Sequence, residues 1–411
     1  MTRLNFTLDQ DDVKKILLSK DSGELKALKE AVLNQILQAE AAEQVGAEYY
    51  ERSPDRTTQR NGSRIRTLTT RVGSLVLHVP KFRNGTFSTE LFARYSRSER
   101  AFQLALIEMV IHGVSTRKVT EITDVLCGTT ISKSTVSRLC AELDAPIRAF
   151  RERPLDRYYP FLVVDAMYVK VRERGRIVSK GLLIVLGISE SGHREVLAFD
   201  YADSESYESW RALFRGLRAR GISKVDLIVS DDHAGLVQAL HETFHGTMWQ
   251  RCQTHFSRNL NGSVPRALRS QVKALLTDLY NSPTYEAASA RKEDLLDILS
   301  TSGCEKARDL LDESFADITS IFSLPSHYRR KLRTSNMIER LNEELRRRER
   351  VIRIFPNAES VIRLLGAILL ETHEQWISGR AYMNLDNYEL EQQESPATQL
   401  KIVEKKVGGV S

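Results

Sequence analysis

The fold of this chain is decided by one stretch, FLVVDAMYVKV, which occupies residues 161–171. Its apolar and β-branched residues predict a long strand that is buried in its first half. Asp165 interrupts the apolar run, although a carboxylate that is buried without a partner is costly. The residue therefore requires a metal ion, a cation or several hydrogen-bond donors, and a structural salt bridge is the alternative to a functional role.

Strands and helices alternate on the carboxyl-terminal side of this stretch. Residues 182–188 and 195–201 predict two further strands, so that an antiparallel meander forms. The segments that follow predict, in order, a helix over 205–218, an apolar strand over 225–229, a helix after His233 and a short strand over 248–251. This order indicates a mixed sheet that is covered on both faces, as in ribonuclease-H-like domains.

The remainder of the chain is mainly helical. From 257 to 324 the strand signal disappears before a polar, basic helix begins near Thr334, so a helical insertion interrupts the sheet domain. Residues 21–49 predict an amphipathic helix that pairs with another subunit or packs within the chain. Residues 102–145 predict three short helices, of which the last two form a helix-turn-helix that either reads DNA or serves only as a packing unit.

Between these helices, residues 51–100 have strand character. Arg60-Asn61-Gly62 indicates a turn, alternating apolar residues over 75–79 indicate a strand, and Asn84-Gly85 indicates a hairpin. From Arg56 to Arg83 there are seven basic residues and no acidic one. Such a basic segment suits a DNA phosphate backbone, although a merely solvated surface has the same composition.

We therefore expect a multidomain chain of the α/β class with additional helical domains, since 411 residues exceed the usual size of one domain. The expected regions are an N-terminal helical region for dimerisation (1–50), a basic, β-containing DNA-binding segment (51–100), a helix-turn-helix-like DNA-binding domain (101–150), the first part of a ribonuclease-H-like catalytic domain (155–256), an α-helical insertion domain (257–326), the carboxyl-terminal helices of the catalytic domain (327–385) and a mobile tail (386–411).

Composition and short motifs exclude several classes of protein. No stretch approaches the ~18 apolar residues of a membrane span, and residues 1–20 lack the pattern of a signal peptide, so we expect a cytoplasmic protein without a membrane partner. Four cysteines without paired spacing argue against a disulfide framework. The absence of a Gly-rich phosphate loop and of a serine nucleophile elbow argues against an NTPase and against hydrolases of that type.

Charge is distributed unevenly along the chain. The formal net charge is +6, but residues 51–100 carry a net +7 and residues 329–353 a net +6, so the rest is acidic. Clustered positive charge indicates a polyanionic partner, because neutralising phosphates releases counterions.

Two further acids complete a candidate catalytic set. Asp231 ends an apolar strand at the position where open α/β sheets place ligands, although it or Asp232 would also serve as a helix N-cap. We prefer Asp231 to Asp232 because it is the first residue to leave the strand. Glu339 lies near the start of a predicted helix, where it could merely close a capping box with Asn336.

A single function, metal binding, would account for Asp165, Asp231 and Glu339 together. Two carboxylates on adjacent strands and a third on a following helix can hold two Mg²⁺ ions roughly 4 Å apart, with Mn²⁺ as a substitute. Such ions activate a water or a 3′-hydroxyl and stabilise the leaving oxygen. The helix continues into Arg346-Arg347-Arg348, whose guanidinium groups would reach the phosphates beside the scissile bond.

Cys252 and His255 have the spacing of half a zinc site, and His241 and His245 lie upstream. The six residues between the two pairs are fewer than a standard finger loop needs. We therefore interpret Cys252 and His255 as a brace beside the active site.

Several motifs, taken in their order and spacing, resemble the mutator-type transposases of bacterial insertion sequences between about Arg60 and Asn357. The matching segments are Arg60-Asn61-Gly62, Val79-Pro80-Lys81-Phe82-Arg83-Asn84-Gly85, Ser115-Thr116-Arg117, Thr135-Val136-Ser137-Arg138, Asp165-Ala166-Met167-Tyr168, Ser230-Asp231-Asp232-His233-Ala234-Gly235-Leu236, Gln250-Arg251-Cys252-Gln253-Thr254-His255, Asn336-Met337-Ile338-Glu339-Arg340-Leu341-Asn342 and Phe355-Pro356-Asn357.

The resemblance implies a ribonuclease-H-like catalytic domain with an aspartate, aspartate, glutamate (DDE) triad, which falls on Asp165, Asp231 and Glu339. It also implies an α-helical insertion before the glutamate, and it places Cys252 and His255 in a signature near the active site. Transfer through a circular intermediate and assembly as a homodimer are further implications. Asp232 stands where the family usually has a small residue.

The expected function is thus that of a DNA transposase that binds the terminal inverted repeats of an insertion sequence and the target DNA. Asn336 and Arg340 would support the active site. The expected DNA contacts are Arg60, Arg64, Arg66, Arg71, Lys81, Arg83, Arg117, Lys133, Ser134, Thr135, Ser137, Arg138, Arg346, Arg347 and Arg348. Two alternatives are a non-catalytic DNA-binding regulator and a ribonuclease-H-like nuclease or resolvase that cuts without joining.

Overall fold

The computed structural model describes residues 22–48, 50–51, 53–54, 56–70, 72–89, 100–127, 130–388 and 390–391. The predicted DNA contact Arg71, the beginning of the predicted N-terminal region and most of the predicted mobile tail lie outside these residues. The chain divides into two compact units, Met1–Glu142 and Leu143–Ser411.

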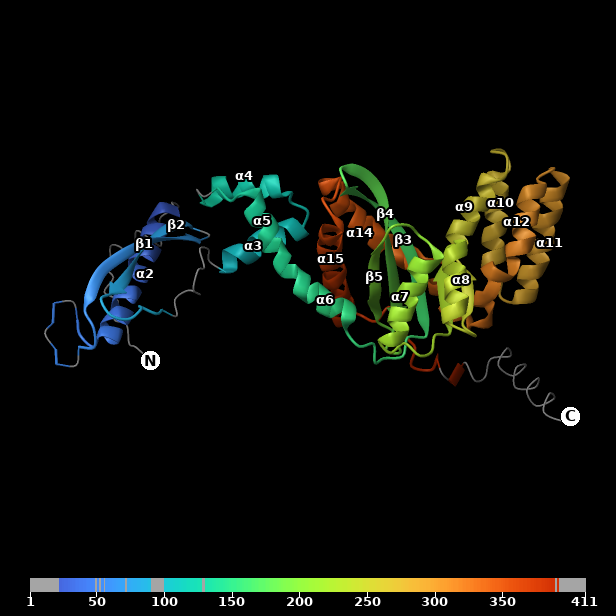
Figure 1. Ribbon diagram of the computed structural model, residues 1–411. Helices are drawn as coiled ribbons and strands as arrows, with labels where there is room; N and C mark the ends of the chain where they lie inside the picture. Colours follow the sequence, from blue (N-terminus) through green and yellow to red (C-terminus); the bar gives the residue numbers. More distant parts are fainter. Residues whose placement is uncertain are drawn as a thin grey trace. The chain divides into compact units, whose positions relative to one another are not determined.

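The first unit contains a helix and a two-stranded antiparallel sheet, namely α2 (Ser22–Val45), β1 (Arg60–Thr70) and β2 (Gly73–Phe82) (Figure 1). Leu37 of α2 packs against Leu75 and Leu77 of β2, which confirms the helix predicted over 21–49 and the strand predicted over 75–79. These contacts between α2 and the sheet form one small core.

The positions of the two predicted turns in this sheet were wrong. The strands are joined after Thr70, which pairs with Gly73, whereas Asn84-Gly85 follows β2. Arg60-Asn61-Gly62 lies inside β1, where the pairing register shifts. Gly62 has a φ of 70°, a conformation that favours glycine, so the same residue that suggests a turn instead forms an irregularity in a strand.

The other part of the first unit consists of α3 (Arg100–Ile111), α4 (Thr116–Cys127) and α5 (Lys133–Cys140), as the sequence predicts. Phe102, Val119 and Val136, one from each helix, are buried in a common core. Ser132 caps α5, because its side chain accepts a hydrogen bond from the Thr135 backbone N–H. Lys133, Ser134, Ser137 and Arg138 remain exposed around this helix.

The second unit is built on a five-stranded mixed sheet in the order β5-β4-β3-β6-β7. The bounds are Phe161–Glu173 for β3, Arg176–Ile188 for β4, Arg194–Ala202 for β5, Leu227–Ser230 for β6 and Met248–Arg251 for β7. β3, β4 and β5 form the predicted antiparallel meander, and β6 and β7 run parallel to β3. The predicted mixed sheet is therefore confirmed.

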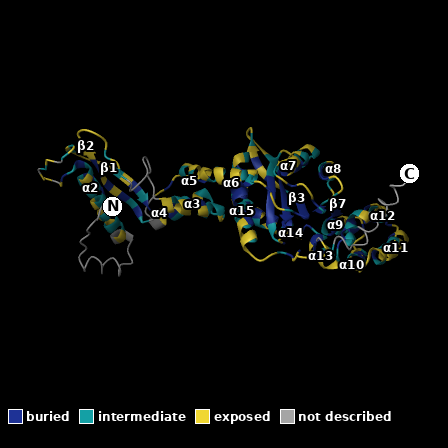
Figure 2. Cartoon of the chain, turned by 90° about the horizontal axis from the view of Figure 1, so that it is seen from below, coloured by how far each residue is buried: buried dark blue, intermediate teal, exposed yellow. Residues whose placement is uncertain are grey.

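Helices cover both faces of this sheet, as Figure 1 shows. α7 (Tyr207–Ala219) and α8 (Ala234–Thr243) bury one face, to which Leu162 and Val164 of β3 contribute. α14 (Asn336–Ile352) and α15 (Ala358–Ser378) lie on the other face, against β3 and β5, and α6 (Asp144–Glu152) packs on α15. Figure 2 shows β3 as a buried strand, as expected for the centre of a covered sheet.

Arginine side chains occupy the open edge of β5. Arg153 donates to the Val196 carbonyl at 2.6 Å, and Arg220 donates to the Leu197 carbonyl at 2.8 Å. An edge strand with unpaired backbone groups is prone to pair with other chains. The guanidinium groups satisfy these carbonyls and so leave fewer backbone acceptors for an added strand.

The segment between β7 and α14 is helical, as the absence of a strand signal predicts. Its helices are α9 (Gln253–Gly262), α10 (Arg269–Tyr280), α11 (Tyr285–Thr301), α12 (Glu305–Thr319), the short 3-10 helix η2 (Ser320–Ser323) and α13 (Ser326–Leu332). Phe256, Leu276, Leu295 and Leu311 belong to a core of their own. In the described part of the chain, no helix combines the length and the apolar character that crossing a bilayer requires.

Candidate functional site

Asp165 and Asp231 lie at the same level of the sheet. Val163 of β3 pairs with Val229 of β6 in parallel register, and each aspartate follows its valine by two residues. Neighbouring strands are about 4.8 Å apart, so this register brings both aspartates to the carboxyl end of β6. The parallel pairing of β3 with β6 thus brings the backbone positions of the first two candidate acids to the same edge region of the sheet.

Asp165 is held by Asn342 of α14, whose Nδ2 donates to Oδ2 at 2.9 Å. Burial raises the pKa of Asp165 to about 6, and the neighbouring carboxylates of Glu205 and Glu339 add to this rise. A backbone hydrogen bond and the positive charge of His255 oppose it. Within the described residues no lysine or arginine forms an ion pair with Asp165, so a structural salt bridge does not explain its burial.

The structure distinguishes the two consecutive aspartates after β6. Asp232 forms an ion pair with Nη1 of Arg251 at 2.8 Å, and the same nitrogen donates to Oγ of Ser314 at 2.8 Å. Asp231 instead accepts a hydrogen bond from the Asp232 backbone N–H at 2.8 Å. Neither aspartate caps α8, whose N-cap is His233. The arginine therefore engages Asp232, whereas the carboxylate of Asp231 forms no ion pair with it.

Glu339 lies in the first turn of α14, but the predicted cap was wrong by one residue. Ser335 is the N-cap, it makes no side-chain capping bond, and Asn336 is the first helical residue. The Glu339 Oε1 lies 3.5 Å from Nε2 of His255 and 3.5 Å from Oγ of Ser335. The Glu339 carboxylate thus faces the side chains of His255 and Ser335 rather than the backbone N–H groups of its own helix terminus.

Cys252, His255 and Glu339 form a compact group whose potential ligand atoms all lie within 4.8 Å of one another. Ser335 donates to the Cys252 sulfur from Oγ at 3.1 Å and from its backbone N–H at 3.3 Å. The hydrogen bond with Cys252 raises the pKa of His255 to about 9 against the effect of burial, and the charges of Asp231 and Asp165 contribute.

Burial opposes ionisation of the Cys252 thiol, but the hydrogen bonds from His255 and Ser335 outweigh it and lower the pKa. His255 is therefore protonated at neutral pH, and its positive charge favours ionisation of the Cys252 thiol. The charge of His255 interacts electrostatically with both Asp165 and Asp231, and its Nε2 contacts the carboxylate of Glu339.

The three acids are brought into one region but not into one tight group. Among the described residues, the group that could share a single ion contains Glu339 but neither aspartate. Carboxylate oxygens suit Mg²⁺, whereas a cysteine sulfur suits softer metals. The carboxylates of Asp165 and Asp231 are therefore donors of the kind that suits Mg²⁺ or Mn²⁺, and the charge of Glu339 on the facing helix α14 also acts on Asp165.

Two glutamines fix the motif around Cys252 to the helical segment. Gln250 donates to the Ile318 carbonyl at 2.9 Å and accepts from the Ile321 N–H at 2.8 Å. Gln253 also donates to the Ile318 carbonyl, at 2.9 Å, and its N–H donates to the Arg333 carbonyl at 3.1 Å. β7, the end of α12 and the approach to α14 are thereby tied together.

Sequence reasoning missed Ser335, Asn342, Arg251 and Glu205 as parts of this site. Asn342 follows Glu339 by three residues, and residues at this spacing share one face of a helix. That spacing is a signal that could have revealed Asn342. The other three contacts join residues that only the tertiary fold brings together.

The predicted supporting and DNA-binding residues of the second unit have different environments. Asn336 and Arg340 are both exposed on α14. Arg346 is exposed, whereas Arg347 and Arg348 form ion pairs with Glu344 at 2.9 and 3.0 Å. These pairs partly neutralise the predicted arginine cluster, so Arg346 has the greatest freedom to reach a phosphate.

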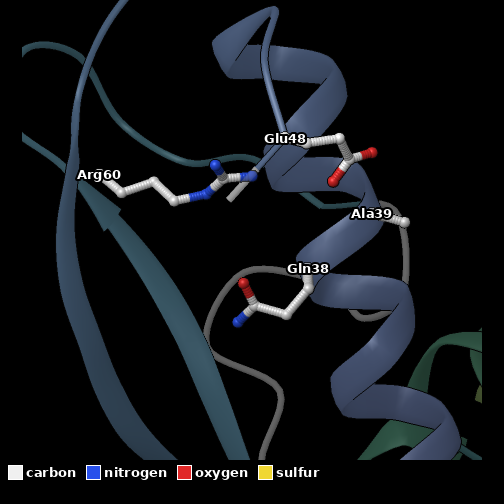
Figure 3. A pocket seen from close by; sticks show the side chains of 4 residues that line it. All are labelled: Gln38, Ala39, Glu48 and Arg60. Carbon is white, nitrogen blue, oxygen red and sulfur yellow. The ribbon is translucent and has the colours of Figure 1, made fainter. Parts of the chain in front are cut away.

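Most predicted DNA contacts of the first unit lie at its surface. Exposed residues are Arg64, Lys81, Arg83, Arg117, Lys133, Ser134, Ser137 and Arg138, and half-buried ones are Arg60, Arg66 and Thr135. Arg60 donates from Nη1 to the Ala47 carbonyl at 3.2 Å. Figure 3 shows it at a hollow of about 460 Å³ that Gln38, Ala39 and Glu48 also line. Arg60 thus has a structural contact at the end of α2.

The model of the family described as "Transposase, Mutator family" matches residues 1–379. The chain belongs to this transposase family. It is 39% identical over 94% of its length to the whole transposase for insertion sequence element IS256 in transposon Tn4001 of Staphylococcus aureus. It is 43% identical over 94% of its length, and over 97% of that relative, to the transposase for ISRM5 of Rhizobium meliloti.

A third relative is the transposase for IS1081 of Mycobacterium tuberculosis, with 40% identity over 88% of each chain. Among solved structures, the Drosophila P element transposase strand transfer complex aligns with 69% of this chain and 94% of that chain, at 12% identity and a TM-score of 0.39. This similarity is too weak to support a conclusion. The family match and these relatives confirm the resemblance that the motifs suggest. Transposases are enzymes that cut and join DNA.

Proposed function

We propose that this transposase acts on an insertion sequence, cleaving DNA at the ends of the element and joining the freed 3′-hydroxyl to another strand. Asp165, Asp231 and Glu339 would hold two Mg²⁺ ions, with Mn²⁺ as a substitute. The main support is the parallel register of β3 with β6, in which Asp165 and Asp231 each follow a paired valine by two residues. When bound, the two ions would activate the attacking oxygen and stabilise the leaving oxygen.

The residues of the chain would orient the three acids. Asn342 donates to Oδ2 of Asp165 and so restricts the rotation of that carboxylate. Arg251 would hold the carboxylate of Asp232 in an ion pair, so that Asp231 rather than Asp232 serves as the metal ligand. His255 would act as a positively charged brace that limits the repulsion among the acids before a metal ion arrives. Arg346 would contact a phosphate beside the cleaved bond.

DNA recognition is proposed for the first unit. α4 and α5 would act as a helix-turn-helix that reads the terminal inverted repeats, while the basic β1–β2 sheet contacts phosphates. The five-stranded sheet of the second unit and its covering helices would form a ribonuclease-H-like catalytic domain, with α9–α12 as its helical insertion. Relatives that are named as transposases for insertion sequence elements support this assignment. The enzyme would act as a homodimer on DNA in the bacterial cytosol.

Incubation of the purified protein with Mg²⁺ and labelled element ends tests the proposal. Joined strands support transposition, cleavage without joining indicates a nuclease, and binding alone indicates a regulator. Alanine at Asp165, Asp231 or Glu339 should abolish cleavage and joining while DNA binding is retained. Asp232→Ala is the matched control, because it removes an adjacent carboxylate that Arg251 engages. An inactive Asp232→Ala together with an active Asp231→Ala would reassign the second ligand.

A further inference from the structure

Three cations and two aromatic rings meet on the second unit, outside the acidic site. The Arg194 guanidinium lies 4.4 Å from the ring centroid of Trp376 and 4.8 Å from that of Tyr382. The Lys331 ammonium lies 4.9 Å from the Tyr382 ring and also donates to the Tyr382 carbonyl. Burial lowers the pKa of Arg194 and raises the pKa of Tyr382, and the nearby positive charge of Arg340 acts to lower both pKa values. We call these five residues the cation–aromatic cluster.

The backbone holds the cluster in place. The Tyr382 N–H donates to the Gly192 carbonyl at 2.8 Å, and the His193 ring contacts the Gly379 carbonyl at 3.2 Å. Gly192 has a φ of 77°, and a Cβ atom there would lie 1.8 Å from the Met383 carbonyl oxygen. Only glycine allows this close approach, so the segment after α15 is fixed against the turn between β4 and β5.

The cluster is positively charged without an internal counterion. In the part of the chain that the structure describes, Arg194, Lys331 and Arg340 form no ion pair with a carboxylate. Burial lowers the pKa of Arg194, and repulsion from Arg340 acts in the same direction. Lys331 and Arg340 are exposed, so their charges are available to an external anion. Like charges that the fold holds together suit a polyanion whose phosphates neutralise them.

Arg340 also connects the cluster to the candidate active site, since it directly follows Glu339 on α14. Adjacent residues of a helix point in different directions, so Glu339 faces His255 while the charge of Arg340 acts on Arg194, and the cluster borders the acidic site rather than entering it.

We propose that the cation–aromatic cluster binds the phosphodiester backbone of DNA beside the position of cleavage, which rests on the proposed function of the acidic site. Lys331 and Arg340 contact phosphates directly. Arg194, fixed between the rings of Trp376 and Tyr382, adds a third positive charge whose position does not depend on the DNA. The contacts are to phosphates rather than to base edges, so they act equally on any DNA sequence.

The test measures DNA affinity without divalent metal over a range of NaCl concentrations. Each lost phosphate contact should reduce the slope of log K against log[NaCl] by about 0.9. Lys331→Gln and Arg340→Gln should each show this reduction, with a duplex that carries the element end and with a scrambled duplex alike. Arg215→Gln is the matched control, because Arg215 is an exposed arginine on α7, which covers the opposite face of the sheet.

Unchanged slopes for both Lys331→Gln and Arg340→Gln would overturn the proposal, as would an equal reduction for Arg215→Gln. A purely structural cluster predicts that Arg194→Gln lowers the urea midpoint of the second unit and that no variant changes the salt slope. If the wild-type protein neither cleaves nor joins DNA but the slopes change as expected, the proposed function fails while the DNA-binding surface stands.

Discussion

Replacing Asp165 by asparagine should stabilise the metal-free protein at neutral pH, although it removes a residue of the proposed active site. The fold raises the pKa of this carboxyl from 3.8 to about 6, chiefly through burial. A rise of about 2 units at about 1.36 kcal/mol per unit corresponds to roughly 3 kcal/mol, by which the charged form destabilises the folded state. Asparagine avoids this cost and can still accept the hydrogen bond from Asn342.

The sign of the pH dependence follows from the direction of the shift. Because the folded protein binds the proton more tightly than the unfolded chain, ionisation of Asp165 destabilises the fold progressively as pH rises from about 4 to about 6. The advantage of Asp165→Asn over wild type should be near zero at about pH 4 and should reach its full value of about 3 kcal/mol above about pH 7.

Urea unfolding in EDTA, followed by tryptophan fluorescence, measures this difference. All three tryptophans, Trp210, Trp249 and Trp376, lie in the second unit, so the signal reports the unfolding of the unit that contains the site. The exposed residue Asp156 provides the matched control, since Asp156→Asn removes the same charge without relieving burial. Mg²⁺ should then stabilise wild type more than Asp165→Asn. Equal stability of the two proteins in EDTA at pH values from about 4 to 8 would refute the argument.

Three further substitutions test the supporting contacts. Asn342→Ala should weaken Mn²⁺ binding about tenfold or more in titration calorimetry, since the carboxylate of Asp165 loses its orienting donor; unchanged affinity would contradict this role. Arg251→Ala should lower the free energy of unfolding by about 1–3 kcal/mol in urea titrations, because Asp232 and a buried serine lose their donor, and a change below about 0.5 kcal/mol would count against it. Gly235→Ala should cost about 1–3 kcal/mol, since the new Cβ would lie 2.6 Å from a backbone nitrogen of α7, and a neutral effect would show that α7 and α8 can separate freely.

The acids on the strands could be predicted because each interrupts or ends an apolar run. Asp165 stands within FLVVDAMYV, and Asp231 follows a buried strand, so the cost of burying a charge is visible in the sequence. The choice between Asp231 and Asp232 rested on strand geometry alone. The preference stays a prediction. The ion pair of Arg251 with Asp232, which distinguishes the two aspartates, requires β7 to lie beside β6, and nothing local in the sequence specifies that pairing.

Contacts between distant segments could not be predicted. Asn342 and Asp165 are 177 residues apart, and the residues that bring Arg194 next to Tyr382 likewise come from separate elements. Local signals also misled where tertiary structure overrode them: Asn84-Gly85 has the composition of a hairpin turn but follows the hairpin instead. Propensity describes what a short segment tolerates, whereas pairing partners decide where the turn forms.

Hydrogen bonds near both ends of α14 fix the position of this helix relative to the sheet. Near its start, Ser335 binds the Cys252 sulfur. Beyond its end, Phe355 donates to the Lys170 carbonyl and accepts from the Arg172 N–H, both at 2.8 Å, so that the chain continues alongside β3. Between these points Asn342 reaches Asp165.

These three attachments set the height of Glu339 above the sheet edge without any contribution from DNA. The Glu339 carboxylate itself lies 3.5 Å from Nε2 of His255. A helix fixed in this way would present Glu339 to metal ions held together with Asp165 and Asp231 at little cost in backbone reorganisation, since the scaffold is already ordered on folding. The motif that ends at Asn357 would then be a positional element of the site as much as Glu339 itself.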